Sequence, residues 1–227
     1  VFSSNGAMYP TQMYVDKFEM SDGSRYVPVE DDSNENKRWK NRDKRFDQNF
    51  WVHGDLGGNF RKINLAEGGA HFGATKMKNV YFIHKFWPLG IDDSNKQGGF
   101  NYTTPFLRLA DIYLTYAEAA YEATGSYSIA PNGLTMTAAE AVNIVRRRAG
   151  QPSAEETLPN YDRILPNSCE LESDEAFRLL YRNERAVELA FEGSYWFDIR
   201  RWKRAHLKDG NNLYGIYFEL EGNNSDP

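Results

Sequence analysis

Residues 182–202 read Arg-Asn-Glu-Arg-Ala-Val-Glu-Leu-Ala-Phe-Glu-Gly-Ser-Tyr-Trp-Phe-Asp-Ile-Arg-Arg-Trp, and this stretch decides the fold. Upstream of it, Ser173 is a suitable N-cap, and the apolar side chains that follow recur at spacings of three and four. Gly193 lies where a helix needs a residue at positive φ in order to end. The pattern predicts an amphipathic helix that ends at Gly193 and an aromatic, basic helix that begins directly after it.

The same stretch carries a row of carboxylates. Glu184, Glu188 and Glu192 are spaced by four, which places them on one stripe of a helix. Such a row suits a metal ion or an acid and base pair, but functional carboxylates usually lie in clefts with few cations nearby. The cations around this row are Arg178, Arg182, Arg185, Arg200 and Arg201. We therefore predict that the glutamates are ion-paired and that Asp198 extends the pairing across the corner between the helices.

Two further helices are expected upstream, and they form a hairpin. Residues 107–124 carry polar side chains on one stripe with Leu, Ile, Tyr and Ala elsewhere, and Gly125 ends this helix. The next helix begins with a capping box of Thr137 and Glu140 and ends at Gly150. Small residues at the contact predict repeat-like helical hairpins of the tetratricopeptide type, although the connection of about a dozen residues is too long for a tight repeat turn.

The first part of the chain has a different composition. It is rich in Gly, Asn, Asp and aromatic residues, and the apolar runs at 50–52 and 80–83 predict brief strands between turns. Because binding residues usually lie on loops carried by a rigid scaffold, we expect residues 1–105 to face a ligand and residues 106–227 to form the scaffold, as one continuous structural unit. The predicted class is mainly α, a tetratricopeptide-like scaffold with irregular loops and a few short β-strands.

Aromatic residues among polar neighbours are the candidate ligand contacts of the first region. A sugar ring has apolar C–H faces and a rim of hydroxyls, so it fits a flat aromatic side chain flanked by hydrogen-bonding side chains. The predicted ligand-binding residues are Trp51, Trp39, Trp87, Asp55 and Tyr102. For each aromatic residue taken singly, packing in a core is the more common role, and it stays the alternative.

Composition and motifs exclude several classes of function. With 27 basic and 32 acidic residues the net charge is −5, which points neither to nucleic acid nor to an anionic membrane surface. Cys169 is the only cysteine, and the four histidines lack a metal-ligand spacing, so no disulfide framework, metal or cofactor is predicted. The acidic runs at 31–35 and 92–95 offer calcium ligands without the spacing of a calcium loop, so solvated loops are predicted there.

Catalytic motifs are absent from the sequence. It contains no Gly-x-Ser-x-Gly elbow and no phosphate-binding Gly-x-x-x-x-Gly-Lys loop. A glycosidase needs two carboxylates set across a cleft, a separation that sequence does not reveal, and the arginines beside the helical glutamates weaken this alternative. We therefore expect that this protein is not an enzyme. No apolar run approaches the roughly 20 residues that span a bilayer.

Several of these motifs, taken together and in order, resemble the SusD/RagB family of surface-exposed nutrient-binding lipoproteins. The matching landmarks are Pro10-Thr11-Gln12, residues 18–23, 41–46, 81–85, 108–119, 141–150 and 182–202. The resemblance implies the C-terminal half of a longer protein, held at the outer-membrane surface by an N-terminal lipid anchor outside this chain.

The function implied by the resemblance is non-catalytic. It is the capture of oligosaccharide during polysaccharide utilization and its delivery to a SusC-like TonB-dependent transporter. Peptide capture on the same scaffold is one alternative, and a repeat-type protein-interaction adaptor is another.

Overall fold

The chain divides into two compact units. A computed structural model describes residues 9–27, 38–57, 62–66, 69, 81–87, 105–161, 165, 170–171 and 175–207. Unit 1 comprises residues 1–15, 47–104 and 213–227, and unit 2 comprises residues 16–46 and 105–212. The expected boundary between residues 105 and 106 stays a prediction. The predictions at Tyr102, Cys169, Ser173, His71 and the acidic runs 31–35 and 92–95 lie outside the described residues.

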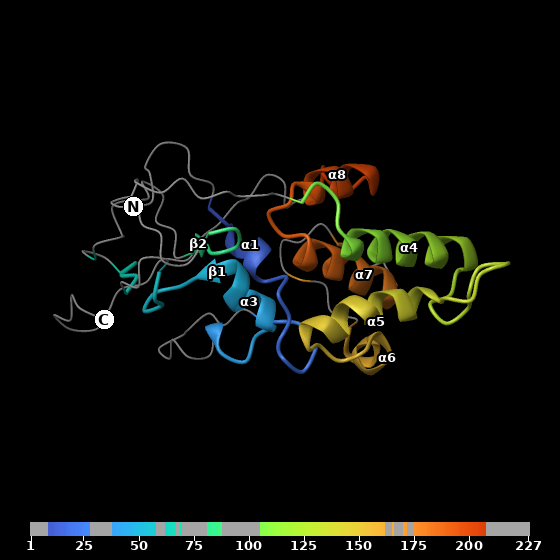
Figure 1. The fold of residues 1–227 in the computed structure, drawn as a ribbon, viewed down its shortest axis with the longest axis horizontal. Helices are drawn as coiled ribbons and strands as arrows, with labels where there is room; N and C mark the ends of the chain where they lie inside the picture. The colour runs from blue at the N-terminus through green and yellow to red at the C-terminus, as the bar shows by residue number, and fades with distance from the viewer. Residues whose placement is uncertain are drawn as a thin grey trace. The chain divides into compact units, whose positions relative to one another are not determined.

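Unit 2 is helical, which confirms the predicted class. Its helices are α4 (Leu109–Thr124), α5 (Ala138–Ala149), α6 (Ala154–Thr157), the short 3-10 helix η2 (Leu158–Asn160), α7 (Ala176–Glu188) and α8 (Ser194–Arg201). The helices α4 and α5 form the predicted hairpin, and both pack against α7 (Figure 1). The short helix α3 (Lys44–Asn49) has residues in both units.

Local sequence sets the ends of the hairpin helices. The predicted capping box is present, because Thr137 Oγ1 accepts from the Glu140 N–H at 3.1 Å and Glu140 Oε2 accepts from the Thr137 N–H at 2.7 Å. The glycines that end α4 and α5 are left-handed, with φ of 66° at Gly125 and 78° at Gly150. These ends follow from neighbouring residues alone, and the sequence predicted them correctly.

Helix α7 ends earlier than the sequence predicted. It ends at Glu188, and a turn through residues 189–193 leads into α8. The Glu188 carbonyl accepts a hydrogen bond from Arg108 Nη2 at 2.5 Å, so a cation from the start of α4 caps this end of the helix. Gly193 has φ of 83°, as expected for its residue type, but it precedes α8 and does not end α7.

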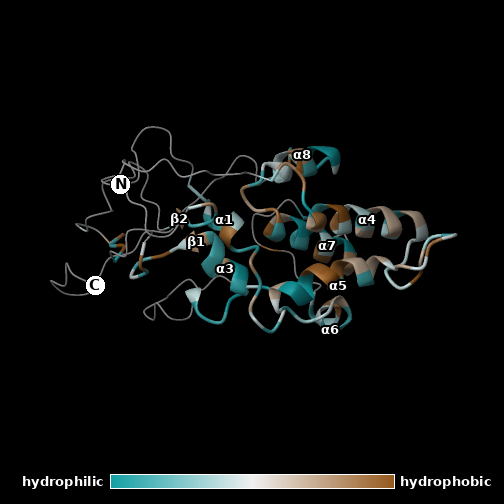
Figure 2. Cartoon of the chain, in the orientation of Figure 1, coloured by the Kyte–Doolittle hydropathy of each residue, from teal (hydrophilic) through white to brown (hydrophobic). Residues whose placement is uncertain are grey.

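The core of unit 2 fills the space between α4, α5 and α7 with small and aromatic residues. Ala117 of α4 and Ala141 of α5 are fully buried, which lets their helices approach closely. Phe177 of α7 lies among tyrosines, with its ring centroid 5.0 Å from Tyr121 and 5.8 Å from Tyr181. Hydrophobic residues recur along α4 and α5, whereas α8 ends hydrophilic (Figure 2).

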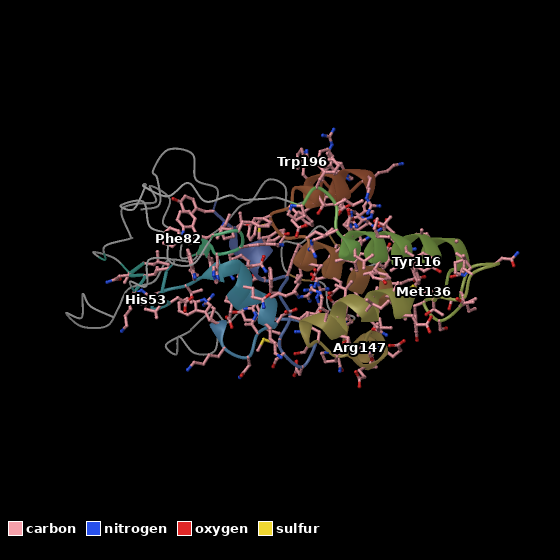
Figure 3. All side chains as sticks on the ribbon, in the orientation of Figure 1. His53, Phe82, Tyr116, Met136, Arg147 and Trp196 are labelled. Atoms are coloured by element: carbon pink, nitrogen blue, oxygen red, sulfur yellow. The ribbon has the colours of Figure 1, made fainter. Side chains whose placement is uncertain are left out.

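The chain between α4 and α5 is fixed to the hairpin. The Tyr116 hydroxyl of α4 donates to the carbonyl of Met136 at 2.5 Å, and Figure 3 shows the two residues next to each other. The Ala139 N–H donates to the Tyr127 carbonyl at 3.0 Å. The long connection is therefore held to the hairpin at two points, Tyr127 and Met136.

Unit 1 contains the brief strands that the sequence predicted. These are β1 (Phe50–Trp51) and β2 (Phe82–Ile83), which pair antiparallel with Trp51 opposite Phe82. The short helix α1 (Gln12–Val15) precedes them in the chain.

Candidate functional site

Trp51, the first of the predicted ligand contacts, lies in a small core of unit 1. Its side chain packs with Ile63, Leu65 and Phe82 and is only 3% exposed. The ring of His84 stacks on it, with centroids 4.5 Å apart and planes inclined by 19°. Trp51 therefore supports the neighbouring aromatic residues, and its contact with a ligand stays a prediction.

Trp87 is the predicted aromatic residue that combines partial exposure with rigid support. It is half-buried and packs edge-on against Trp51, with ring centroids 6.4 Å apart and planes inclined by 69°. Its backbone N–H donates to the His84 carbonyl at 2.9 Å, which fixes the turn after β2. An aromatic side chain held in this way offers surface at a small entropic cost.

Asp55 lies in the turn after β1, where Gly54 adopts φ of 89°. Its Oδ2 accepts from the Val52 N–H at 2.8 Å. The pKa of Asp55 is raised above its ordinary value, mainly because burial disfavours the charged carboxylate. The charge of Asp47 adds to this rise, whereas the hydrogen bond from Val52 and the nearby His84 oppose it. The carboxylate is half-buried and keeps acceptor positions beyond its one backbone hydrogen bond.

The structure brings together some of the predicted site residues. Trp51, Trp87 and Asp55 belong to the described part of unit 1, and Trp39 is a half-buried residue of unit 2. Sequence reasoning missed His84, whose Nδ1 donates to the Asp47 carbonyl at 2.8 Å. The strand period was the available signal, because a residue two positions after Phe82 falls on the same face of the strand.

His53 has a structural role in the same unit. Its Nδ1 accepts from the Leu65 N–H at 3.1 Å, and Figure 3 labels His53 and Phe82 of this unit. The hydrogen bond joins the segment after β1 to residues 62–66. Together with the described strands it makes a rigid backing for Trp87.

The glutamates of α7 are ion-paired, as the sequence predicted. Glu188 contacts Arg45 at 3.0 Å, Arg108 at 2.5 Å and Arg148 at 2.5 Å. Arg108 also pairs with Glu192 at 2.7 Å. Every one of these cations comes from outside α7.

Two arginines of α7, Arg178 and Arg185, pair with carboxylates outside the row, which corrects the expected pairing. Arg178 pairs with Glu122 at 2.9 Å, and Arg185 pairs with Asp111 at 2.6 Å and with Asp198 at 2.7 Å. These side chains extend from the other faces of α7 towards the polar stripe of α4 and towards Asp198 in α8. The pairing of Asp198 across the corner is confirmed.

A fully buried arginine lies at the centre of this network. Arg146 is 0% exposed, and its Nη atoms donate to Glu19 at 2.9 Å, Glu184 at 3.0 Å and Thr157 at 3.0 Å. Its Nε donates to the Pro152 carbonyl at 2.7 Å. Burial raises the pKa of Glu19, although Arg146 opposes this change. These groups satisfy one another inside the fold, which is a structural role.

Acidification is expected to destabilise the protein through Glu188. Burial alone would raise its pKa, but Arg45, Arg108 and Arg148 outweigh burial and hold the pKa below the ordinary 4.5. A carboxylate with a lowered folded-state pKa stabilises the fold fully above its unfolded pKa, and the contribution is lost as pH falls through the folded value. Glu19, whose pKa is raised, opposes part of this loss.

Urea denaturation at a pH of about 7 and of about 4 measures the effect. Stability should be lower at the acidic pH, and Glu188→Gln should flatten the dependence because it removes the titrating group. Equal urea midpoints for the unsubstituted chain at both pH values would contradict a stabilising role of ionised Glu188.

A small pocket, part of it open to solvent, lies between α7 and α8 in unit 2. Tyr195 and Trp202 line it, together with polar residues that include Lys17 and Glu170. Glu170 pairs with Arg25 at 2.5 Å, and among the described residues that line the pocket it is the one carboxylate. Glycoside hydrolysis ordinarily uses two carboxylates, so this lining does not resemble a hydrolase site.

Two further properties of the described helices and side chains bear on function. None of the helices in the described ranges is both long and apolar enough to cross a membrane. Within the same ranges, no group of three or more His, Cys, Asp or Glu side chains is placed to hold a metal ion.

Comparison with known proteins gives a consistent result. The family model described as the SusD family matches residues 2–225. The fold is similar to a SusD-like carbohydrate-binding protein from Bacteroides fragilis, with a TM-score of 0.63 and 23% identity over 91% of this chain and 37% of that one. A second solved structure, BT4246, has a TM-score of 0.65 and 24% identity over 94% of this chain and 37% of its own. No curated protein matches the sequence.

Proposed function

The chain belongs to the SusD family, and from that premise we propose that it captures oligosaccharide at the outer-membrane surface and delivers it to a TonB-dependent transporter. The family match over residues 2–225 carries the proposal. One structural neighbour is itself named as a carbohydrate-binding protein, which supports the ligand class. The chain spans 37% of the length of each solved relative, so the activity of the whole protein is part of the proposal.

We place the sugar contact at the partly exposed edge of Trp87, with Asp55 as a hydroxyl acceptor. Trp51 backs the indole and His84 backs Trp51, so the aromatic platform is held rigid. Stacking of a sugar ring on an indole buries apolar C–H surface, and a carboxylate accepts from the hydroxyl rim. Trp39 and Tyr102, the other predicted contacts, stay part of the proposal.

The proposed role is binding without catalysis. Glu184, Glu188 and Glu192 each contact at least one arginine, and the described residues that line the pocket include one carboxylate. A carboxylate held by several cations has a low pKa and is poorly suited to donate a proton to a leaving group. Incubation with a panel of glycans should therefore yield no new reducing ends. The appearance of such ends would overturn this part of the proposal.

Removal of the Trp87 side chain tests the ligand contact. Trp87→Ala is expected to weaken oligosaccharide binding by about tenfold, because a ring-stacking surface is lost. Calorimetric titration with a panel of glycans and peptides measures it. Trp196→Ala serves as the matched control, since Trp196 is 57% exposed on α8 in the other unit and should leave binding unchanged.

The outcomes of this titration are distinct. If no glycan binds and a peptide does, the protein captures peptide, which is the alternative stated for the same scaffold. If a glycan binds equally to the chain and to Trp87→Ala, the contact lies elsewhere while the capture function stands.

Delivery to the transporter is tested separately from ligand binding. A TonB-dependent transporter encoded in the neighbouring reading frame should co-purify with the full-length protein from detergent-solubilised membranes. Absence of a stable complex with that transporter would contradict the delivery step and leave oligosaccharide capture intact.

A further inference from the structure

His84 joins three segments of unit 1 around the aromatic platform, which consists of Trp51 and Trp87. Its backbone N–H donates to the Asn49 carbonyl at 2.8 Å, at the end of α3, and its carbonyl accepts from the Trp87 N–H at 2.9 Å. Its ring stacks on Trp51 of β1, with centroids 4.5 Å apart and planes inclined by 19°. His84 is therefore placed to act on Trp51 directly and on Trp87 through Trp51.

The hydrogen bond of the imidazole fixes which ring nitrogen carries the proton. Nδ1 of His84 lies 2.8 Å from the carbonyl oxygen of Asp47. Because a carbonyl oxygen only accepts, Nδ1 is the donor, and Nε2 of the neutral ring is an acceptor. Among the described residues, Nε2 has no hydrogen-bond partner. A second proton therefore binds at Nε2 without breaking a hydrogen bond in this part of the fold.

Two carboxylates face His84 from separate elements. Asp47 belongs to α3 and Asp55 to the turn after β1. Burial raises the pKa of each, and His84 opposes the rise, so both carboxylates interact with a charge on the imidazole. In the described part of unit 1, neither carboxylate takes part in an ion pair. The adjacent cation, Lys85, is directed to the ring of Phe86, with Nζ 5.4 Å from the centroid.

We propose that His84 is a positioning residue of the aromatic platform and that its protonation strengthens the hold on Trp51 and hence on Trp87. A protonated imidazole on an indole face is a cation–π pair, and its Nδ1 hydrogen bond becomes charge-assisted. Asp47 and Asp55 attract the same charged ring. Histidine changes its charge over roughly pH 5 to 8, so oligosaccharide capture depends on pH in that range.

The inference rests on the proposed function, because the platform is the proposed sugar contact. Apparent affinity falls in proportion to the fraction of molecules in which the binding surface is correctly placed. Trp87 is half-buried and meets Trp51 edge-on, so a loosened Trp51 leaves Trp87 with less support. A cation–π contact changes an equilibrium constant by about threefold, which is the expected size of the pH effect.

Intrinsic tryptophan fluorescence tests the His84 contact without any ligand. A protonated imidazole stacked on an indole quenches its emission, so the emission should fall as the pH is lowered from about 8 to about 6. The fall should be absent from His84→Phe, which keeps a stacking ring but has no titrating group. His206→Phe is the matched control and should keep the fall, because His206 is an exposed histidine of unit 2.

Calorimetric titration measures the effect on capture. The probe is the tightest binder among four neutral oligosaccharides, namely maltohexaose, cellohexaose, xylohexaose and mannohexaose. The unsubstituted chain should bind it about threefold more tightly at a pH of about 6 than at a pH of about 8. His84→Phe should bind equally at both, because its ring carries no charge. His84→Ala should bind more weakly at both, because the stack on Trp51 is lost.

Failure of this inference is distinguishable from failure of the proposed function. A fluorescence change that persists in His84→Phe, or disappears in His206→Phe, would overturn the role of His84 whatever the chain binds. Glycan binding with the same pH dependence in the chain and in His84→Phe, or with none in either, would also overturn it and leave capture standing. If none of the four glycans binds, the capture function loses its support, and the fluorescence comparison alone decides the role of His84.

Discussion

Replacement of Arg146 by alanine should lower the free energy of unfolding by about 3–5 kcal/mol, because it leaves buried carboxylates without their cation. Glu19 and Glu184 are 2% and 1% exposed and both pair with this guanidinium. The backbone carbonyl of Pro152 and the hydroxyl of Thr157 lose a donor as well. Urea denaturation followed by circular dichroism measures the change.

The adjacent residue provides the control for Arg146. Arg147 carries the same charge on the same helix but is exposed, and Arg147→Ala should change stability by no more than about 0.5 kcal/mol. Arg146→Lys is also expected to be costly, since an ammonium lacks the five donors in a planar fork. Near-equal stability of the Arg146 and Arg147 variants would mean that the network is not a structural centre.

Phe177→Ala is expected to cost about 3–5 kcal/mol, through lost burial and the cavity left behind. The Phe177 side chain is 3% exposed. Its ring packs against three tyrosines, with centroids 5.0 Å from Tyr121, 5.3 Å from Tyr127 and 5.8 Å from Tyr181. Since Tyr127 lies in the connection between α4 and α5, the loss should also loosen that connection.

Phe197→Ala is the comparison for Phe177, because Phe197 is 67% exposed and buries little surface in this chain. Its free energy of unfolding should change by less than about 0.5 kcal/mol. Thermal and urea unfolding of both variants give the comparison. A Phe177→Ala variant as stable as Phe197→Ala would place the core elsewhere.

Local features of the fold were predictable from sequence, because their causes lie within a few residues. The capping box at Thr137 and the left-handed glycines at Gly125 and Gly150 belong to this group. The two brief strands, Phe50–Trp51 and Phe82–Ile83, were predicted as strands by apolar alternation between turns, whereas their pairing was not. In each case the side chain that decides the conformation lies beside the residue that adopts it.

Features with a distant cause were not predictable. Helix α7 ends at Glu188, where Arg108 donates a hydrogen bond to the Glu188 carbonyl from 80 residues away in the chain. The cations that neutralise Glu188 come from α5 and from residues 45 and 108, although α7 has arginines of its own. The sequence showed that enough arginines are present to neutralise the glutamates. Which arginine pairs with which glutamate depends on how the helices pack, and the sequence does not reveal this.

The candidate site was only partly predictable for the same reason. Apolar alternation identified Trp51 as a strand residue, yet its 3% exposure follows from Ile63, Leu65 and His84, which close over it from separate segments. Sequence placed Trp51 and Trp87 in one list of candidates. Packing separates them into a supporting residue and a partly exposed one.

The way unit 2 is assembled has a consequence for its synthesis. Arg45 is joined to Glu184 at 2.6 Å across 139 residues of chain, and Arg146 is joined to Glu19 across 127 residues. Glu19 and Arg45 thus leave the ribosome long before the helices that carry their partners, and non-local contacts of this kind slow folding. Glu19 waits for Arg146 of α5 and Arg45 waits for Glu184 of α7, so the early segment carries charged groups without their partners until both helices have been made.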